Sequence, residues 1–435
     1  MNMITPLPSA ASAASSASSP HDFFLARQPI LNREQRLVAY ELLFRSTGQQ
    51  QTAVVSDDVE ATATVIAHAA ELGMEQVVGL QLAFINVDAV ALMSDFIRFL
   101  PHHRVVLEIL ETVRVTPELL ARISQLRQAG FRFALDDVVG ESSDVQQLLP
   151  LIDVIKVDIA QLSPDALGGL VPTLALSRKK LLAEKVETVA QFEQCLALGF
   201  DFFQGYYFAR PVILTGKKMS PSELTILRLL EMVQSDADHR DIERCIQHDA
   251  IISLNLLRLV NTPAVSAGAR IDTLGQALML LGRRQLQRWL QILLYVKPGS
   301  GAPFASPLLQ LATTRGKQLE LMTEKLRPGQ HQYADIGFTV GIMSLMDALF
   351  SMQMSEVVSS VRVHGRVSDA LLFRHGELGH MLALVEQVEQ ADDGPATRAM
   401  LDELHLSQDD LNTIQVSAYE WVNSYVQDIS LHASH

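Results

Sequence analysis

Acidic and amide side chains stand at the carboxyl ends of a series of apolar, strand-like runs in this sequence. The runs are YELLFR at Glu41, LAFINVD at Asn86, RVVLEILE at Glu108 and Glu111, FRFALDD at Asp136 and Asp137, DVIKVD at Lys156 and Asp158, KLLAEKVE at Glu184 and Glu187, and FDFFQGYYF at Gln204. Polar groups at the ends of successive parallel strands converge at one mouth of a closed barrel. Carboxylates gathered there repel one another unless cations neutralise them. The pattern therefore indicates a divalent-metal site.

The ligand types favour a hard cation. The runs offer carboxylate and amide oxygens and neither histidine nor cysteine, so we expect Mg²⁺ or Mn²⁺ and not zinc. Two such ions close together activate water, neutralise phosphoryl charge and align an in-line displacement. Phosphodiester hydrolysis is the chemistry that needs all three effects.

Strand-like runs alternate with helical stretches between residues 22 and 211. The clearest helical stretches are 57–73, 116–130 and 188–199. Thr116 followed by Pro117 is a helix start signal, and Gly130 and Gly199 are stop signals. This alternation predicts a parallel sheet with right-handed crossovers, and about seven repeats favour closure into a TIM-like (β/α) barrel.

The segment 209–223 breaks this pattern, with Pro211, Gly216 and Pro221. Beyond it strand signals nearly vanish. Helical periodicity marks the segments 223–234, 241–261, 274–296 and 334–352. We therefore expect an α/β barrel followed by an all-helical domain. The expected parts are a disordered Ala/Ser-rich tail over 1–21, the barrel over 22–213 and the helical domain over 214–435.

Composition limits the partners and the location. The 435 residues carry a formal net charge of −14, which argues against a nucleic-acid duplex as partner. A small anionic ligand stays compatible if metals supply positive charge. No apolar run is long enough for a membrane helix. Cys195 and Cys245 lack the spacing of a disulfide framework or metal motif, so free thiols and a cytoplasmic location are expected.

The N-terminal motifs, in their order, resemble the EAL family of cyclic di-GMP phosphodiesterases. The matching motifs are Gln28-Pro29-Ile30, Glu41-Leu42-Leu43 with Arg45 behind it, Asn86, Glu108 with Glu111, Asp136-Asp137, Lys156-Val157-Asp158, Ala183 to Glu187, and Gln204-Gly205-Tyr206. One such motif would be weak, but their shared order along the N-terminal half makes the resemblance specific. It implies a barrel that opens one phosphodiester of cyclic di-GMP to give linear pGpG.

The resemblance also implies roles for these residues. One metal would be held by Glu41, Asn86, Glu108 and Asp136. The second would be surrounded by Asp136, Asp137 and Glu184. Lys156 would lie near the attacking water, Glu184 would serve as a base, and Glu111 would brace the Asp-Asp loop. The residues facing the dinucleotide would be Gln28, Arg45, Asp158, Glu187 and Gln204.

The C-terminal half resembles an HDOD domain. The matching stretches are 248–263 and 271–282, with Asp249, Arg258 and Asn261 at pattern positions. The combination resembles the YuxH-like group of two-domain signalling proteins and implies a protein partner of unknown identity. HDOD domains lack the metal-binding histidines of HD hydrolases, so the His248-Asp249 pair is expected to be structural. The methionines of 343–354 are expected to fill the core.

Two departures from the family pattern keep a second function open. The glycine- and aromatic-rich loop after the Asp-Asp pair is replaced by residues 138–144, which keep only Gly140, and Lys185 stands where the family has glycine. The complete ligand set favours a hydrolase. The departures favour an inactive EAL domain that acts as a cyclic di-GMP receptor and controls partner binding.

The sequence favours two further functions less. One is a scaffold that has lost nucleotide binding. The other is a glycoside hydrolase, which would leave Lys156 and the Asp-Asp pair without a role. The family's dimer contact uses the altered loop 138–144, so the resemblance permits a homodimer without requiring one.

Overall fold

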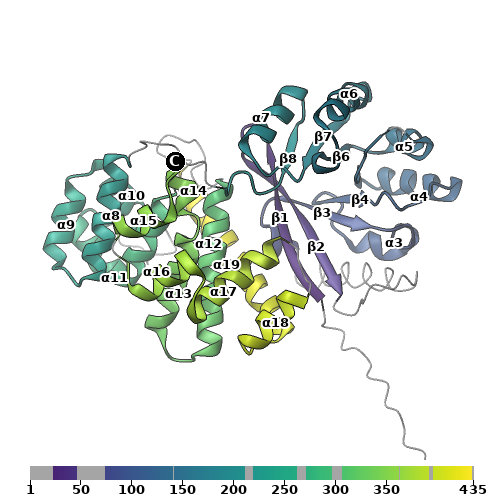
Figure 1. The fold of residues 1–435 in the computed structure, drawn as a ribbon. Coiled ribbons are helices and arrows are strands. Elements are labelled where there is room, and N and C mark those ends of the chain that lie inside the picture. The colour runs from purple at the N-terminus through teal and green to yellow at the C-terminus, as the bar shows by residue number, and fades with distance from the viewer. Residues whose placement is uncertain are drawn as a thin grey trace, which may run out of the picture.

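The computed structural model describes most of the chain (Figure 1). The described ranges are 23–46, 74–140, 142–210, 219–261, 271–295, 306–361, 363–390 and 395–433. The expected tail over 1–21 and the expected helix over 57–73 lie outside these ranges. Eight strands form a closed barrel in the order of the sequence, and helices make up the described residues that follow it. The expected fold class is confirmed.

The strands of the barrel are β1 (Phe23–Asn32), β2 (Leu37–Ser46), β3 (Leu82–Val87), β4 (Val105–Ile109), β5 (Arg132–Leu135), β6 (Val154–Asp158), β7 (Lys180–Glu184) and β8 (Phe202–Gln204). The helices around them are α2 (Met74–Val78), α3 (Ala89–Met93), α4 (Pro117–Gln128), α5 (Ser143–Leu148), α6 (Pro164–Ala175) and α7 (Val189–Leu198). Strands β2 to β8 pair in parallel, as predicted.

The prediction of an all-parallel sheet is wrong for β1, which runs antiparallel to both β2 and β8. Only residues 33–36 join β1 to β2, and so short a connection makes a hairpin because a parallel crossover needs a dozen or more residues. Asn32 closes this turn, because its side-chain oxygen accepts hydrogen bonds from the backbone N–H groups of Glu34 and Arg36.

The predicted helix signals act as expected in α4 and α7. The Thr116 side chain accepts a hydrogen bond from the N–H of Leu119, and α4 begins at the next residue, a proline. Thr188 and Gln191 form a capping box at the start of α7. Gly199 ends α7 at a φ of 103°, a left-handed conformation that favours glycine.

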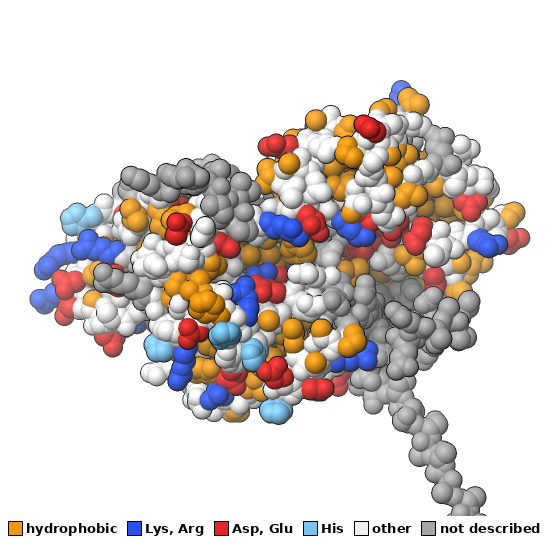
Figure 2. All heavy atoms as spheres, viewed as in Figure 1, with side chains coloured by type: hydrophobic (Ala, Val, Ile, Leu, Met, Phe, Trp, Pro, Cys, Tyr) orange, Lys and Arg blue, Asp and Glu red, His pale blue; other side chains and the backbone are white. Residues whose placement is uncertain are grey.

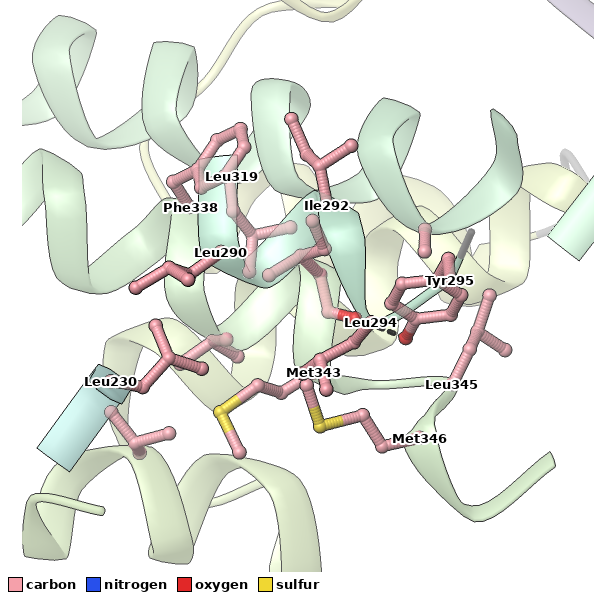
Figure 3. Close-up of a cluster of buried hydrophobic side chains, with 14 of the residues drawn as sticks. Leu230, Leu290, Ile292, Leu294, Tyr295, Leu319, Phe338, Met343, Leu345 and Met346 are labelled. Atoms are coloured by element: carbon pink, nitrogen blue, oxygen red, sulfur yellow. Dashed lines mark hydrogen bonds between the residues drawn. The ribbon is translucent and has the colours of Figure 1, made fainter. Parts of the chain in front are cut away.

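The helical domain contains α8 (Pro221–Gln234), α9 (His239–Gln247), α10 (Ala250–Val260), α11 (Leu274–Leu293), α12 (Pro307–Leu326), α13 (His331–Met343), α14 (Met346–Phe350), α15 (Met354–Val361), α16 (Gly365–Phe373), α17 (Gly376–Glu389), α18 (Pro395–Glu403) and α19 (Gln408–Ala433). Its helices share one hydrophobic core, part of which is drawn in Figure 3. Met343 and Met346 are buried in that core, as the sequence predicts.

The segment 241–261 forms two helices where its periodicity suggested one. The break falls at His248 and Asp249, and the Asp249 carboxylate caps α10 by accepting hydrogen bonds from the N–H groups of Ile251 and Ile252. His248 contacts the carbonyl of Arg244 in the preceding turn. This pair is therefore a helix junction, as its expected structural role implied.

The last helix returns to the barrel. Helix α19 packs against β1 and α2, and Figure 1 shows α17 and α19 beside β1 and β2. Tyr419 of α19 belongs to the buried cluster that otherwise consists of barrel residues. The proposed domain boundary near residue 213 lies outside the described ranges and stays a prediction.

Acidic and basic side chains are interspersed over both domains on the face shown in Figure 2. The exposed surface drawn there carries no broad patch of one sign. None of the described helices has the length and apolar character needed to cross a lipid bilayer.

Candidate active site

The site is one layer of side chains in the barrel interior. It follows from the alternation of side chains along each strand. A buried apolar layer is formed by Ile30, Ala39, Phe84, Val106, Ala134, Val154 and Leu182. The residues two positions away on the same strands are, in order, Gln28, Glu41, Asn86, Glu108, Asp136, Lys156 and Glu184. Gln204 likewise follows Phe202, which packs against the apolar layer. Because side chains on a strand alternate with a period of two, a polar layer lies directly above an apolar one.

Lys156 lies at the centre of this polar layer. Its side chain is 1% exposed, and its ammonium is within 3.3 Å of four carboxylates, three of them on other strands and one, Asp136, directly after β5. The distances are 2.8 Å to Asp136 Oδ1, 2.8 Å to Glu184 Oε1, 3.0 Å to Glu108 Oε1 and 3.3 Å to Glu41 Oε2. One cation therefore faces four buried acids, and the cluster is short of positive charge.

Side-chain amides donate hydrogen bonds to both carboxylate oxygens of Glu41. Gln204 Nε2 donates to Glu41 Oε2 at 2.6 Å and also to Gln28 Oε1 at 2.8 Å. Asn86 Nδ2 donates to Glu41 Oε1 at 3.1 Å. Burial alone would raise the pKa of Glu41, but the Lys156 ammonium and these hydrogen bonds lower it below its usual range. Glu41 is therefore an ionised carboxylate held in one orientation.

The other acids of the layer hold their protons more tightly. Burial raises the pKa of Glu184 to about 8, and neighbouring acids add to this effect against the pull of Lys156. Burial, with the charge of Glu41, raises the pKa of Glu108 well above its usual range. Burial also raises the pKa of Asp136. A single lysine does not neutralise the set, so further positive charge would be bound favourably.

Several oxygens of the layer face inward without a hydrogen-bond donor from the described part of the chain. They are Asn86 Oδ1, Glu108 Oε2 and Gln204 Oε1, whereas Glu108 Oε1 and Asp136 Oδ1 are contacted by the Lys156 ammonium. Buried acceptors are normally satisfied. Unpaired carboxylate and amide oxygens in a layer short of positive charge are the donor set that Mg²⁺ and Mn²⁺ prefer, so these residues fit a divalent cation.

A second group of oxygens lies beside the first. Asp136, Asp137 and Glu184 present ligand atoms that all lie within 4.8 Å of one another. Among the described residues this is the only such group of histidine, cysteine and acidic side chains. Asp137 has a φ of 45°, a left-handed conformation that few residues other than glycine adopt without strain. Backbone strain of this kind is typical of functional sites.

Lys185 does not contact Glu184 through its ammonium. It pairs with Asp158 instead, at 2.5 Å, and its side chain is 60% exposed. Asp158 is fully buried and also accepts hydrogen bonds from Gln161 Nε2 and the N–H of Ala160. Burial would raise the pKa of Asp158, but the three donors lower it. Lys185 has a φ of 55°, which explains why glycine suits this position in the family pattern.

The structure brings most of the predicted site residues together, but Glu111 and Glu187 are more peripheral. Glu111 is exposed and lines a hollow with Asp136, Asp137 and the loop to Val145. Glu187 is exposed and pairs with Arg210 at 3.0 Å. Arg45 is in β2, and its side chain lies outside the described part of the structure.

One residue that supports the site from the outer face of the barrel was not predicted from the sequence. Arg27 precedes Gln28 and is buried against Tyr40 of β2 and Tyr419 of α19. The signal available in the sequence is an arginine within an apolar, strand-like run. Because a charged side chain is rarely buried without a partner, such an arginine indicates a contact with another segment. The identity of the distant partner was not readable from the sequence.

Family models match both halves of this chain. The model of the EAL domain matches residues 11–211, and the model of the HDOD domain matches residues 221–300. The cyclic di-GMP phosphodiesterase CdgJ of Vibrio cholerae is 32% identical over 402 residues, which are 92% of each chain. The uncharacterized protein YuxH of Bacillus subtilis is 29% identical over 84% of this chain and 90% of its own.

Solved structures resemble the barrel half. A structure of the PaMucR phosphodiesterase in a c-di-GMP complex is 22% identical and covers 44% of this chain and 96% of its own, with a TM-score of 0.38.

Proposed function

Because this chain belongs to the family of proteins that join an EAL domain to an HDOD domain, we propose that it hydrolyses cyclic di-GMP to linear pGpG with two divalent cations. One observation carries the proposal: buried Lys156 stands among four convergent carboxylates with unpaired acceptors beside it. The similarity to CdgJ, a cyclic di-GMP phosphodiesterase, supports the substrate.

The cations would be held by residues of the polar layer. Those for the first ion are Glu41, Asn86, Glu108 and Asp136. Those for the second are Asp136, Asp137 and Glu184. When bound, a pair of Mg²⁺ or Mn²⁺ ions lowers the pKa of a water and neutralises phosphoryl charge. Cyclic di-GMP is a dianion, so without them the acidic layer would repel it.

The chain's own residues supply proton transfer and orientation. In its ionised form, the Glu184 carboxylate beside Asp136 and Asp137 would accept a proton from the attacking water. The Lys156 ammonium would remain as a fixed positive charge beside the phosphoryl oxygens as negative charge develops on them. The oxygen of that water would bond to phosphorus as the bond from phosphorus to the ribose oxygen breaks. The ribose oxygen would take the proton that Glu184 had accepted, which leaves the linear dinucleotide.

The dinucleotide would be contacted by amides and flanking side chains. Gln204 Oε1 is an unpaired buried acceptor, and Gln28 lies beside it. Arg45, Asp158 and Glu187 stay predictions as substrate contacts. Asp158 is paired with Lys185 and Glu187 with Arg210 in this structure. Either acid would have to separate from its basic partner before it could contact the nucleotide.

The receptor is the second candidate function. It is favoured by the loop after Asp137, in which Val139 is 52% exposed and only one glycine, Gly140, is retained. A protein partner for the helical domain, a homodimer and a cytoplasmic location also stay predictions.

One experiment separates the two functions. The purified protein is incubated with cyclic di-GMP and Mn²⁺ while product formation is followed by chromatography, and nucleotide binding is measured by calorimetry in Ca²⁺. Linear product that disappears in Glu41→Gln supports the enzyme. Tight binding without product supports the receptor, and absence of both would refute each of them and leave the scaffold.

A further inference from the structure

Strand β1 packs against the helical domain, and together with its two neighbours, β2 and β8, it carries one connected part of the site. Gln28 lies on β1, Glu41 on β2 and Gln204 on β8, and the Gln204 amide donates to both of the others. Strand β1 pairs with β2 on one side and β8 on the other. Helices α17 and α19 pack against β1 (Figure 1). The back of this three-residue group is therefore covered by another domain.

The first attachment is Arg27, the residue before Gln28. Its guanidinium lies between two aromatic rings, 4.3 Å from the centroid of Tyr40 and 3.8 Å from that of Tyr419. It also donates to the carbonyl of Val77 at 2.5 Å and to Thr314 Oγ1 at 3.4 Å. A buried cation between two rings is strongly held. Because Tyr40 precedes Glu41, this sandwich fixes β1 and β2 at the residues next to the site.

The second attachment is Tyr206, two residues after Gln204. Its hydroxyl donates to the carbonyl of Glu389 at 2.6 Å. The Glu389 carboxylate accepts two hydrogen bonds from Arg315, at 2.9 and 2.6 Å, and Arg315 also bonds Glu386. Paired bonds of this kind fix geometry as well as energy. The end of β8 is therefore tied to a buried ionic network of α12 and α17.

We propose that the helical domain positions the Gln28–Glu41–Gln204 group, with Arg27 and Tyr206 as the positioning residues that transmit the contact. Arg27 points away from the interior of the barrel because it is next to inward-facing Gln28 on the same strand. Tyr206 lies beyond the end of β8, and its hydroxyl is bonded to the helical domain. A change that loosens α19 or α17 would move β1, β2 and β8 relative to the five strands that carry the remaining acids. The helical domain would thereby control the affinity of the barrel for metal and nucleotide.

The test uses the full chain, and the part that concerns nucleotide rests on the proposed function. The variants are Tyr419→Leu, which removes one ring of the sandwich, and Tyr206→Phe, which removes only the hydroxyl. Loss of a residue that orients metal ligands costs roughly 10- to 100-fold in affinity or activity. We expect a weakening of that order in Mn²⁺ binding by calorimetry, and faster hydrogen exchange in β1, β2 and β8.

A matched control touches the same interface away from the site. Asn423 of α19 donates to the carbonyl of Gln76 in α2, which bears no proposed site residue. Asn423→Ala should leave Mn²⁺ affinity within about twofold. Tyr419→Phe keeps the ring over Arg27 and should behave like the wild type.

The outcomes distinguish this proposal from the proposed function. Wild-type Mn²⁺ affinity retained in folded Tyr419→Leu and Tyr206→Phe would overturn the positioning role, and so would an equal loss in Asn423→Ala. If the wild-type protein binds Mn²⁺ but forms no pGpG, the proposed hydrolase function is refuted. The positioning role is then still tested by metal affinity and hydrogen exchange in the variants. If Tyr419→Leu does not fold, Tyr206→Phe decides alone.

Discussion

The Lys185 ammonium lies 2.5 Å from Asp158 Oδ2, so this lysine pairs with Asp158 and not with its sequence neighbour Glu184. The cation next to Glu184 in the sequence therefore has a carboxylate partner outside the proposed metal ligands. The Lys185 backbone is left-handed, with a φ of 55°, which costs a non-glycine residue about 1–2 kcal/mol.

We therefore expect Lys185→Gly to change turnover by less than about twofold, since an exposed partner contributes little energy. Lys185→Asn, which tolerates the left-handed backbone without the charge, is the control. Steady-state kinetics check both variants. A large rise in kcat in Lys185→Gly would show that this lysine suppresses the reaction.

Lys156→Met should be severely damaging. The substitution leaves four buried acids without their cation, and breaking a buried ion pair costs about 3–5 kcal/mol. In metal-free protein at pH 8 we expect a loss of that order in the free energy of unfolding, measured with urea. Lys180→Met is the control, because Lys180 pairs with Asp201 at the exposed start of β7. Equal stability of the two variants would contradict the central place given to Lys156.

The pKa shifts predict how Mn²⁺ stabilises the protein at different pH. The pKa of Glu184 is raised from 4.5 to about 8 without metal, so the folded state holds a proton that the unfolded state releases. This stabilisation is complete below about pH 4.5 and is lost as the pH rises toward 8. Bound cations replace the proton, so the rise in Tm on adding Mn²⁺ should be larger at pH 8.5 than at pH 6.

Glu184→Gln tests the origin of that dependence. It removes the titrating group and should flatten the difference between the two pH values, as measured by differential scanning fluorimetry. A Tm increment that is the same at pH 6 and pH 8.5 in the wild type would contradict the assigned direction of the shift.

Gly205→Ala should disrupt the end of β8. Gly205 has a φ of 140°, and a Cβ there would lie 2.1 Å from the carbonyl oxygen of Val186. We expect a destabilisation of more than about 2 kcal/mol and weaker nucleotide binding, because Gln204 would shift with the backbone. Gly168→Ala in α6 meets nothing within 4 Å and should stabilise the chain by up to about 1 kcal/mol. Thermal unfolding of the pair measures the difference.

Local patterns predicted the parts of the site that depend on local geometry. The position of Asn86, Glu108 and Lys156 in strand-like runs with polar ends predicted that they converge. In the structure Lys156 lies 3.0 Å from Glu108, and Asn86 bonds Glu41, which also pairs with Lys156. The antiparallel direction of β1 depends on the short turn after Asn32. A hairpin there was not predicted from the sequence. Asp158 also shares the inward period, but it caps the turn that follows by bonding the N–H of Ala160, so its carboxylate turns aside.

Contacts between distant segments were not predictable in this way. Arg27 and Tyr419 are far apart in the sequence, and neither residue type names its partner. The same holds for Tyr206 and Glu389. Their placement follows from the return of α19 to the barrel, which is decided by the packing of whole helices and not by a pattern within one segment.

The most direct test of the whole account is anomalous scattering from crystals of the protein grown with Mn²⁺. The account predicts two peaks inside the barrel mouth. One would be bounded by Glu41, Asn86, Glu108 and Asp136, and the other by Asp136, Asp137 and Glu184. A fully ordered polar layer with Lys156 alone at its centre and no anomalous peak, at saturating Mn²⁺ and pH 8, would contradict it.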